Sequence, residues 1–265
     1  MKLFSFKGGV KPDPNKRRST ELPIAQAPLA RRYIVPLHQS VGGTPRPIVQ
    51  VGDHVFKGQR IGEADGWVSA AVHAPTSGTV MEVGPHIVPH PSGLTTDCVV
   101  IESDGRDQWI ERTPFDLTNT TADAVREYLR DMGIVGMGGA VFPSHVKLSV
   151  PRGKQVEELI INGAECEPFI TCDDRLMREQ AEEVIQGSAL FGQLIEARRV
   201  LIGVEDNKPE AIAALKAAQE NLGIAVEVIT VPTIYPTGGA KELIRVLTGK
   251  EVPASKRSTD FSVQV

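Results

Sequence analysis

The sequence lacks the paired cysteines that bind iron–sulfur clusters or structural zinc. Its three cysteines, Cys98, Cys166 and Cys172, form no C-x-x-C pair. Three thiolates cannot complete a four-cysteine site. We interpret them as free thiols, which is typical of a cytosolic chain. The sequence therefore predicts no metal site.

The sequence also lacks an excess of basic residues and any long apolar run. Its 29 Lys and Arg residues are outnumbered by 33 Asp and Glu residues, giving a net charge of −4. No basic field therefore points to nucleic acid or to an anionic membrane surface. No apolar run is long enough to span a bilayer, and the start at residues 1–7 is too short for a signal peptide. Any membrane association is expected to depend on partner proteins.

The N-terminal half reads as an extended arm followed by an all-β domain. Prolines among polar residues indicate an arm over residues 1–30. Short Val/Ile segments punctuated by glycine predict hairpins over residues 31–115. Two strand–turn–strand halves, 49–61 and 72–83, resemble the barrel-sandwich hybrid fold of biotinyl and lipoyl carrier domains. The tip between them, residues 61–74, contains no lysine, so we predict a docking or structural module rather than a carrier.

The second half, residues 116–250, reads as an α/β domain with a parallel sheet. Strands that alternate with helices of moderate length favour parallel pairing through right-handed crossovers. The expected strands are 156–162, 199–204 and 224–231, and the expected helices are 121–132, 174–195, 209–222 and 239–248.

Polar or glycine-rich segments follow all three expected strands. These are residues 162–167, 205–208 and 235–240. Ligands of open parallel sheets bind beyond the carboxyl ends of the strands, so these segments are expected to converge on one edge.

A glycine-rich loop at residues 133–144 also precedes the first of these strands. Its spacing differs from the dinucleotide fingerprint, because Val141 stands where a third glycine would be and the loop follows a helix. Without side chains to block them, its backbone N–H groups could still approach a phosphate.

The order of these motifs resembles a known family. The sequence has Gly-x-x-Gly-x-Gly-Gly-Ala-x-Phe-Pro from Gly133, Asn-x-x-Glu-x-Glu-Pro from Asn162 and Tyr-Pro-x-Gly-Gly from Tyr235. This is similar to the flavin-binding subunit of respiratory complex I, and more closely to the RnfC family of the Rnf-type ion-translocating electron transport complex. The resemblance covers Phe4 to Pro253 and includes the segment His73–Val80.

The resemblance implies an electron-input subunit that exchanges hydride between NADH and FMN and passes electrons toward iron–sulfur clusters and ferredoxin. It implies other complex subunits in the membrane as partners, and a peripheral location on the cytoplasmic face of the bacterial inner membrane. It implies no catalytic side chain. The implied cofactor-binding residues are Gly133, Gly136, Gly138 and Gly139 around the FMN phosphate and ribityl chain, Lys147 at the flavin or its phosphate, Asn162 and Glu165 at the flavin, Phe142 and Glu167 at the nucleotide, and Tyr235 and Gly238 on the far wall.

Two departures from the family pattern keep other interpretations open. The family usually has glycine where Val141 stands, and a β-branched residue is costly wherever φ must be positive. Family members also continue into a ferredoxin-like domain with two 4Fe-4S clusters, so we interpret residues 251–265 as a truncated tail. The alternatives are a docking fragment that no longer binds flavin, and a protein like the related A subunit of the sodium-pumping quinone reductase.

Overall fold

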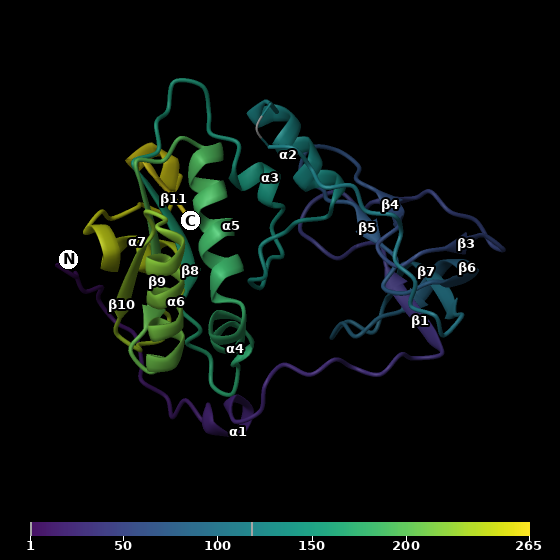
Figure 1. Ribbon diagram of the computed structural model, residues 1–265, viewed down its shortest axis with the longest axis horizontal. Coiled ribbons are helices and arrows are strands. Elements are labelled where there is room, and N and C mark those ends of the chain that lie inside the picture. The colour runs from purple at the N-terminus through teal and green to yellow at the C-terminus, as the bar shows by residue number, and fades with distance from the viewer. Residues whose placement is uncertain (1, 118) are drawn as a thin grey trace. The chain divides into compact units, whose positions relative to one another are not determined.

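The computed structural model describes residues 2–117 and 119–265, which form two compact units (Figure 1). One unit, here called the β unit, spans Ala27–Ser149. The other, the α/β unit, combines the chain up to Gln26 with Val150–Val265. The glycine-rich loop therefore clusters with the β unit, whereas the sequence assigns it to the domain 116–250. In the described part of the chain, no helix has the length and apolar character needed to cross a membrane.

The β unit is built from two antiparallel sheets around an aliphatic core. Val and Ile residues of the strands supply much of this core, and in β7 the four consecutive residues 98–101 are all buried. The core includes Leu37, Ile61, Val80 and Ile101, which are all fully buried. One sheet has the order β1 (Arg32–Pro36), β7 (Thr95–Ser103), β6 (Gly78–Ile87), β3 (His54–Val55), and the other has the order β2 (Arg46–Pro47), β4 (Arg60–Glu63), β5 (Val72–His73).

Helix α2 (Ala122–Asp131) leads from the β unit into the glycine-rich loop. The Thr121 side chain caps it by accepting a hydrogen bond from the Ala124 N–H. The chain then turns at Gly133, whose φ is 67°. A Cβ on Gly133 would lie 2.5 Å from the Ala71 carbonyl oxygen, so only glycine fits there. The loop ends at the short helix α3 (Ser144–Lys147).

The α/β unit contains a four-stranded sheet in which every pair is parallel, as predicted. Its order is β10 (Glu227–Val231), β9 (Arg199–Glu205), β8 (Glu158–Gly163), β11 (Val263–Gln264). Apolar residues occupy both faces of the central strands, because helices cover both faces.

Helices on the two faces of this sheet fix its core. The face with Ile160 and Leu201 packs against Leu243 and Leu247 of α7 (Ala240–Thr248). On the other face Val200 lies against Gly192 of α5 (Ala181–Leu194), beside α6 (Pro209–Leu222). Figure 1 shows α5 and α6 running alongside the strands.

The predicted helix 174–195 is wrong as a single element. It consists of α4 (Cys172–Glu179) and α5, separated by Gln180, whose φ of −131° and ψ of 42° are not helical. The carboxylate of Glu179, directly before the break, accepts a hydrogen bond of 3.0 Å from the Ile24 N–H of the arm. A contact with a segment 155 residues away accompanies the break, and the local sequence carries no sign of it.

The arm and the tail both pack onto the α/β unit. The arm pairs Val10 with Tyr235 and contains the short helix α1 (Arg17–Thr20). In the tail, where the sequence predicts no element, a 3₁₀ helix (Ser258–Phe261) precedes β11. Val263 is fully buried in the core, so the tail completes the sheet beside β8.

Candidate functional site

The glycine-rich loop of the β unit presents a run of unpaired backbone donors. At the base of the loop, the Gly136 N–H donates to the Phe142 carbonyl oxygen at 2.8 Å. At its tip, the Val141 N–H donates to the Gly138 carbonyl oxygen at 2.9 Å. The N–H groups of residues 137–140 donate to no described residue. Cβ atoms on Gly138 and Gly139 would meet nothing within 4 Å. The loop therefore offers an open set of N–H donors, which is the arrangement that suits a phosphate.

Lys147 supplies a positive charge to the same loop. Its ammonium nitrogen lies 3.0 Å from where a Cβ on Gly136 would sit, so it reaches the base of the loop. The side chain is half-buried, and no described residue offers it an acceptor or a counter-charge. Burial lowers the pKa of Lys147, with no neighbouring charge contributing. A half-buried ammonium without a partner carries a desolvation cost that a bound anion would offset.

Val141 adopts a left-handed backbone conformation within this loop. Its φ is 45°, in the region that a β-branched residue rarely enters. Such a conformation costs roughly 1–2 kcal/mol per residue. The positive φ anticipated for this position is therefore present, and Val141 strains the loop.

The strand ends of the α/β unit converge, as predicted. The Asn162 side chain, at the end of β8, donates to the Gly238 carbonyl oxygen at 2.8 Å, and its Oδ1 accepts from the Ala164 N–H at 3.1 Å. Lys208, after β9, donates to the Glu165 carbonyl oxygen at 3.3 Å. A Cβ on Gly238 would lie 2.8 Å from the Ala164 carbonyl oxygen, which explains glycine at this crossing.

Buried charges beneath this edge neutralise one another. Glu165 is 3% exposed, and its carboxylate accepts from the Asp173 and Asp174 N–H groups at the start of α4. Glu205 and Lys208 form a fully buried ion pair of 2.7 Å. Burial, followed by the charge of Glu165, raises the pKa of Asp173. In contrast to the glycine-rich loop, the buried charges of this edge are paired, although the Glu205 Oε1 atom has no hydrogen-bond partner among the described residues.

The remaining predicted residues are distributed between the two units. Phe142 is half-buried in the glycine-rich loop of the β unit. Glu167 and Tyr235 are exposed at the strand-end edge of the α/β unit. The structure thus groups Gly133, Gly136, Gly138, Gly139, Phe142 and Lys147 in one unit, and Asn162, Glu165, Glu167, Tyr235 and Gly238 in the other.

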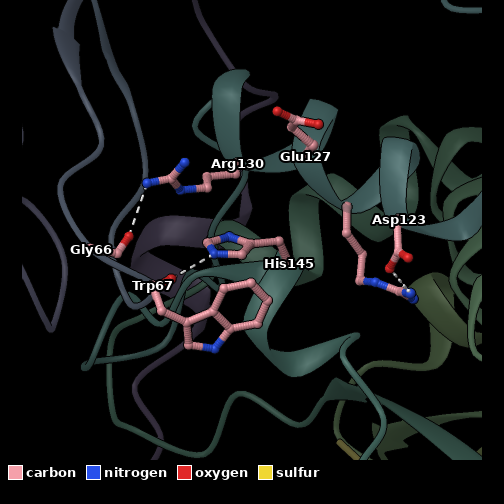
Figure 2. Close-up of a pocket in the computed structure, with 7 residues that line it drawn as sticks. Gly66, Trp67, Asp123, Glu127, Arg130 and His145 are labelled. Carbon is pink, nitrogen blue, oxygen red and sulfur yellow. Dashed lines mark hydrogen bonds and ion pairs between the residues drawn. The ribbon is translucent and has the colours of Figure 1, made fainter.

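A separate hollow of about 500 Å³ lies beside α2 in the β unit (Figure 2). Trp67 packs edge-on against His145, whose Nε2 atom bonds the Trp67 carbonyl oxygen at 2.9 Å. Arg130 donates to the carbonyl oxygens of Ala64 and Gly66. None of the residues predicted to bind a cofactor lines this hollow. The buried Arg130 Nε and His145 Nδ1 atoms have no hydrogen-bond partner among the described residues.

One residue that the sequence interpretation missed lies at the strand-end edge. Lys16, from the arm, donates to the carbonyl oxygens of Glu165, Glu167 and Ile170. It stands among prolines and polar residues with no periodicity. No pattern in the sequence indicates that it reaches a turn about 150 residues away.

Comparison with known proteins now identifies the family. Residues 129–265 match the family model of the Nuo51 FMN-binding domain, and residues 4–106 match that of the RnfC barrel sandwich hybrid domain. The chain belongs to the RnfC family. The resemblance, the α/β fold class and the barrel-sandwich domain expected from the sequence are thereby confirmed.

Several curated relatives extend well beyond the matched region. The C subunit of the ion-translocating oxidoreductase complex of Pseudomonas aeruginosa is 49% identical over 263 residues, covering 98% of this chain and 34% of that protein. Its counterpart from Pasteurella multocida, which has the same name, is 46% identical over 263 residues, covering 99% of this chain and 31% of that protein. The chain thus spans about a third of the length of these relatives.

A solved structure matches part of the chain more weakly. A chain of an NAD+-reducing [NiFe]-hydrogenase in the H2-reduced state is 26% identical, covering 47% of this chain and 23% of that one, with a TM-score of 0.44. We draw no argument from so low a score.

Proposed function

We propose that the chain binds FMN and serves as the electron-input module of an ion-translocating oxidoreductase. The observation that carries the proposal is Lys147, a half-buried ammonium that has no counter-charge among the described residues and lies beside a loop whose N–H groups donate to none of them. A dianionic phosphate would supply the counter-charge for Lys147 and the hydrogen-bond acceptors for the N–H groups of the loop. The match to the Nuo51 FMN-binding domain supports FMN as the molecule that carries this phosphate.

Each group of residues has a distinct task in this proposal. Lys147 and the N–H groups of residues 137–140 would hold the FMN phosphate, while Asn162 and Glu165 would act at the flavin. Phe142 and Glu167 would accept the nucleotide of NADH, and Tyr235 and Gly238 would line the far wall of the site. The bound flavin would supply the step that links two-electron hydride exchange to one-electron transfer. The protein contributes position and charge.

The partners and location follow from the relatives and belong to the same proposal. Those relatives are named as components of ion-translocating oxidoreductase complexes. We propose that this chain associates with the other subunits of such a complex at the cytoplasmic face of the membrane. Electrons would pass onward to 4Fe-4S clusters and ferredoxin.

A titration of the purified chain with flavins tests the proposal. FMN should bind with quenched flavin fluorescence and bleach on addition of NADH under anaerobic conditions. Riboflavin, which lacks the phosphate, should bind at least about tenfold more weakly, because charge-assisted hydrogen bonds are lost. Equal affinity for FMN and riboflavin would show that the loop does not hold a phosphate.

Val141 favours a second function, that of a docking module without flavin. Its backbone has a strained, positive φ in the loop that would receive the phosphate. A colourless chain that binds no added FMN, but still co-purifies with membrane subunits of the complex, would support this alternative.

A further inference from the structure

The arm residue Lys16 occupies a cluster of backbone carbonyl oxygens at the strand-end edge. Its ammonium nitrogen lies 2.6 Å from the backbone carbonyl oxygen of Glu165, 2.8 Å from that of Glu167 and 2.5 Å from that of Ile170. An ammonium group has three N–H donors, so these carbonyls use all of them. Lys16 therefore has no donor left for a ligand. Its ammonium group hydrogen-bonds the backbone of the turn and does not bind a substrate.

This turn requires a cation because its carbonyls point inward. Three carbonyl dipoles that converge on one point repel one another unless a positive charge lies between them. The Lys16 side chain is only 13% exposed, and its nitrogen also lies 4.0 Å from the Glu165 carboxylate. The amine thus occupies the place that a bound metal cation would take in a carbonyl-lined site.

Neighbouring residues of the arm hold the same turn. The Pro14 carbonyl oxygen accepts from the Phe169 N–H at 2.9 Å, and the Ser19 hydroxyl donates to the Phe169 carbonyl oxygen at 2.5 Å. Phe169 has a φ of 68°, a conformation that a non-glycine residue keeps only when its surroundings hold it. Contacts on both sides of Lys16 therefore fix this strained turn.

We propose that Lys16 is a positioning residue, a built-in cation that fixes the turn Glu165–Ile170 and thereby places Glu167 for the nucleotide. The role of Glu167 rests on the proposed function. The fixing of the turn does not, because every contact that carries it lies within the described chain.

Two measurements on Lys16→Met test this proposal, with Lys11→Met as the matched control. Lys11 lies on the same arm but is exposed. The first measurement is NADH oxidation by the FMN-loaded chain, with ferricyanide as acceptor. The second is amide hydrogen exchange over residues 165–171. Lys16→Met should raise the KM for NADH about tenfold and speed exchange at Phe169 by a similar factor. Its kcat should change by no more than about twofold, as should every value for Lys11→Met.

Each outcome decides the proposal. If the two variants behave alike in exchange, Lys16 does not fix the turn. If exchange speeds up while the KM for NADH stays at the wild-type value, the turn does not place a nucleotide-binding group. If the wild-type chain oxidises no NADH, the proposed function fails, and exchange alone then confirms or overturns the fixing of the turn.

A second variant covers a Lys16→Met protein that does not fold. Lys16→Arg keeps the charge, but a planar guanidinium cannot direct three N–H groups from a single nitrogen to three carbonyl oxygens that converge on it, as an ammonium does. Lys16→Arg should raise the KM for NADH and the exchange rate at Phe169 by smaller factors than Lys16→Met does. Wild-type exchange in this variant would also overturn the proposal.

Discussion

The glycine-rich loop and the strand-end edge differ in whether their charged groups have partners. In the part of the chain that the structure describes, the N–H groups of the loop tip have no acceptor and the ammonium of Lys147 has no counter-charge. The edge has its charges paired, with Lys208 bound to Glu205 and Lys16 bound to three carbonyl oxygens. A region with unmatched positive charge gains most from an anionic ligand, whereas a neutralised region gains most from rigidity. We infer that the loop serves to bind an anion, whereas the paired charges of the edge keep its turns rigid.

The largest expected effect comes from breaking the buried pair at the edge. Lys208→Met should lower the free energy of unfolding by about 3–5 kcal/mol, because it leaves the fully buried Glu205 carboxylate without its partner. Chemical denaturation followed by circular dichroism measures this. Lys216→Met, at an exposed position of α6, is the control and should change little.

The double variant Lys208→Met/Glu205→Leu sharpens that result. Removing both charges should recover most of the lost stability, since no unpaired ion stays buried. If the single and double variants were equally stable, the pair would not be the source of the loss.

Removing the charge from the loop should affect binding rather than stability. Lys147→Met should weaken FMN binding by about 10- to 100-fold, the range expected for lost charge-assisted hydrogen bonds. Its free energy of unfolding should stay the same or rise, because an unpaired half-buried charge is removed. Fluorescence titration and denaturation measure the two quantities, and riboflavin binding should be unchanged. A large loss of stability would show that Lys147 serves the fold.

Relieving the backbone strain at Val141 should increase stability and FMN affinity, by smaller amounts than the changes above. Val141→Gly should raise the free energy of unfolding by about 1 kcal/mol and tighten FMN binding about fivefold, because glycine accepts a positive φ without strain. Val135→Gly is the control within the same loop, where φ is not positive, and should be destabilising. Identical dissociation constants for FMN in wild type and Val141→Gly would contradict the expectation.

The smallest expected effect is the pH dependence that Lys147 gives to the loop. Burial lowers its pKa from the ordinary value of 10.5, so its charge is lost at a lower pH than that of exposed lysines. FMN affinity should therefore fall as the pH rises through that lowered pKa. In the same window the unfolded chain binds more protons, so the stability of the free chain should rise with pH. Lys147→Arg should give a flatter affinity profile, since a guanidinium stays charged.

Much of the fold could be predicted because its periodic signals are local. The expected helices 121–132 and 209–222 and the expected strand 156–162 lie close to α2, α6 and β8. The convergence of the strand ends followed from parallel pairing alone. The break at Gln180 and the strand β11 were missed, since both accompany contacts with distant segments.

The sequence motifs name the residues of the candidate site, but they do not say which of those residues already have hydrogen-bond or charge partners. Sequence motifs pointed to Lys147 and Glu165 alike. The structure shows that the carboxylate of Glu165 is already hydrogen-bonded by the N–H groups at the start of α4, whereas Lys147 has no partner among the described residues. No motif distinguishes a satisfied charge from an unsatisfied one, because that depends on what packs around it.

By itself, the sequence determined the family, the two kinds of domain and the strained position in the loop. These follow from residue order and from the φ that each residue type tolerates. Only the tertiary structure decided which charges are neutralised, and that the arm delivers Lys16 to a turn about 150 residues away in the chain. The physical reason is that burial and pairing are properties of three-dimensional neighbours, which no local pattern of residues records.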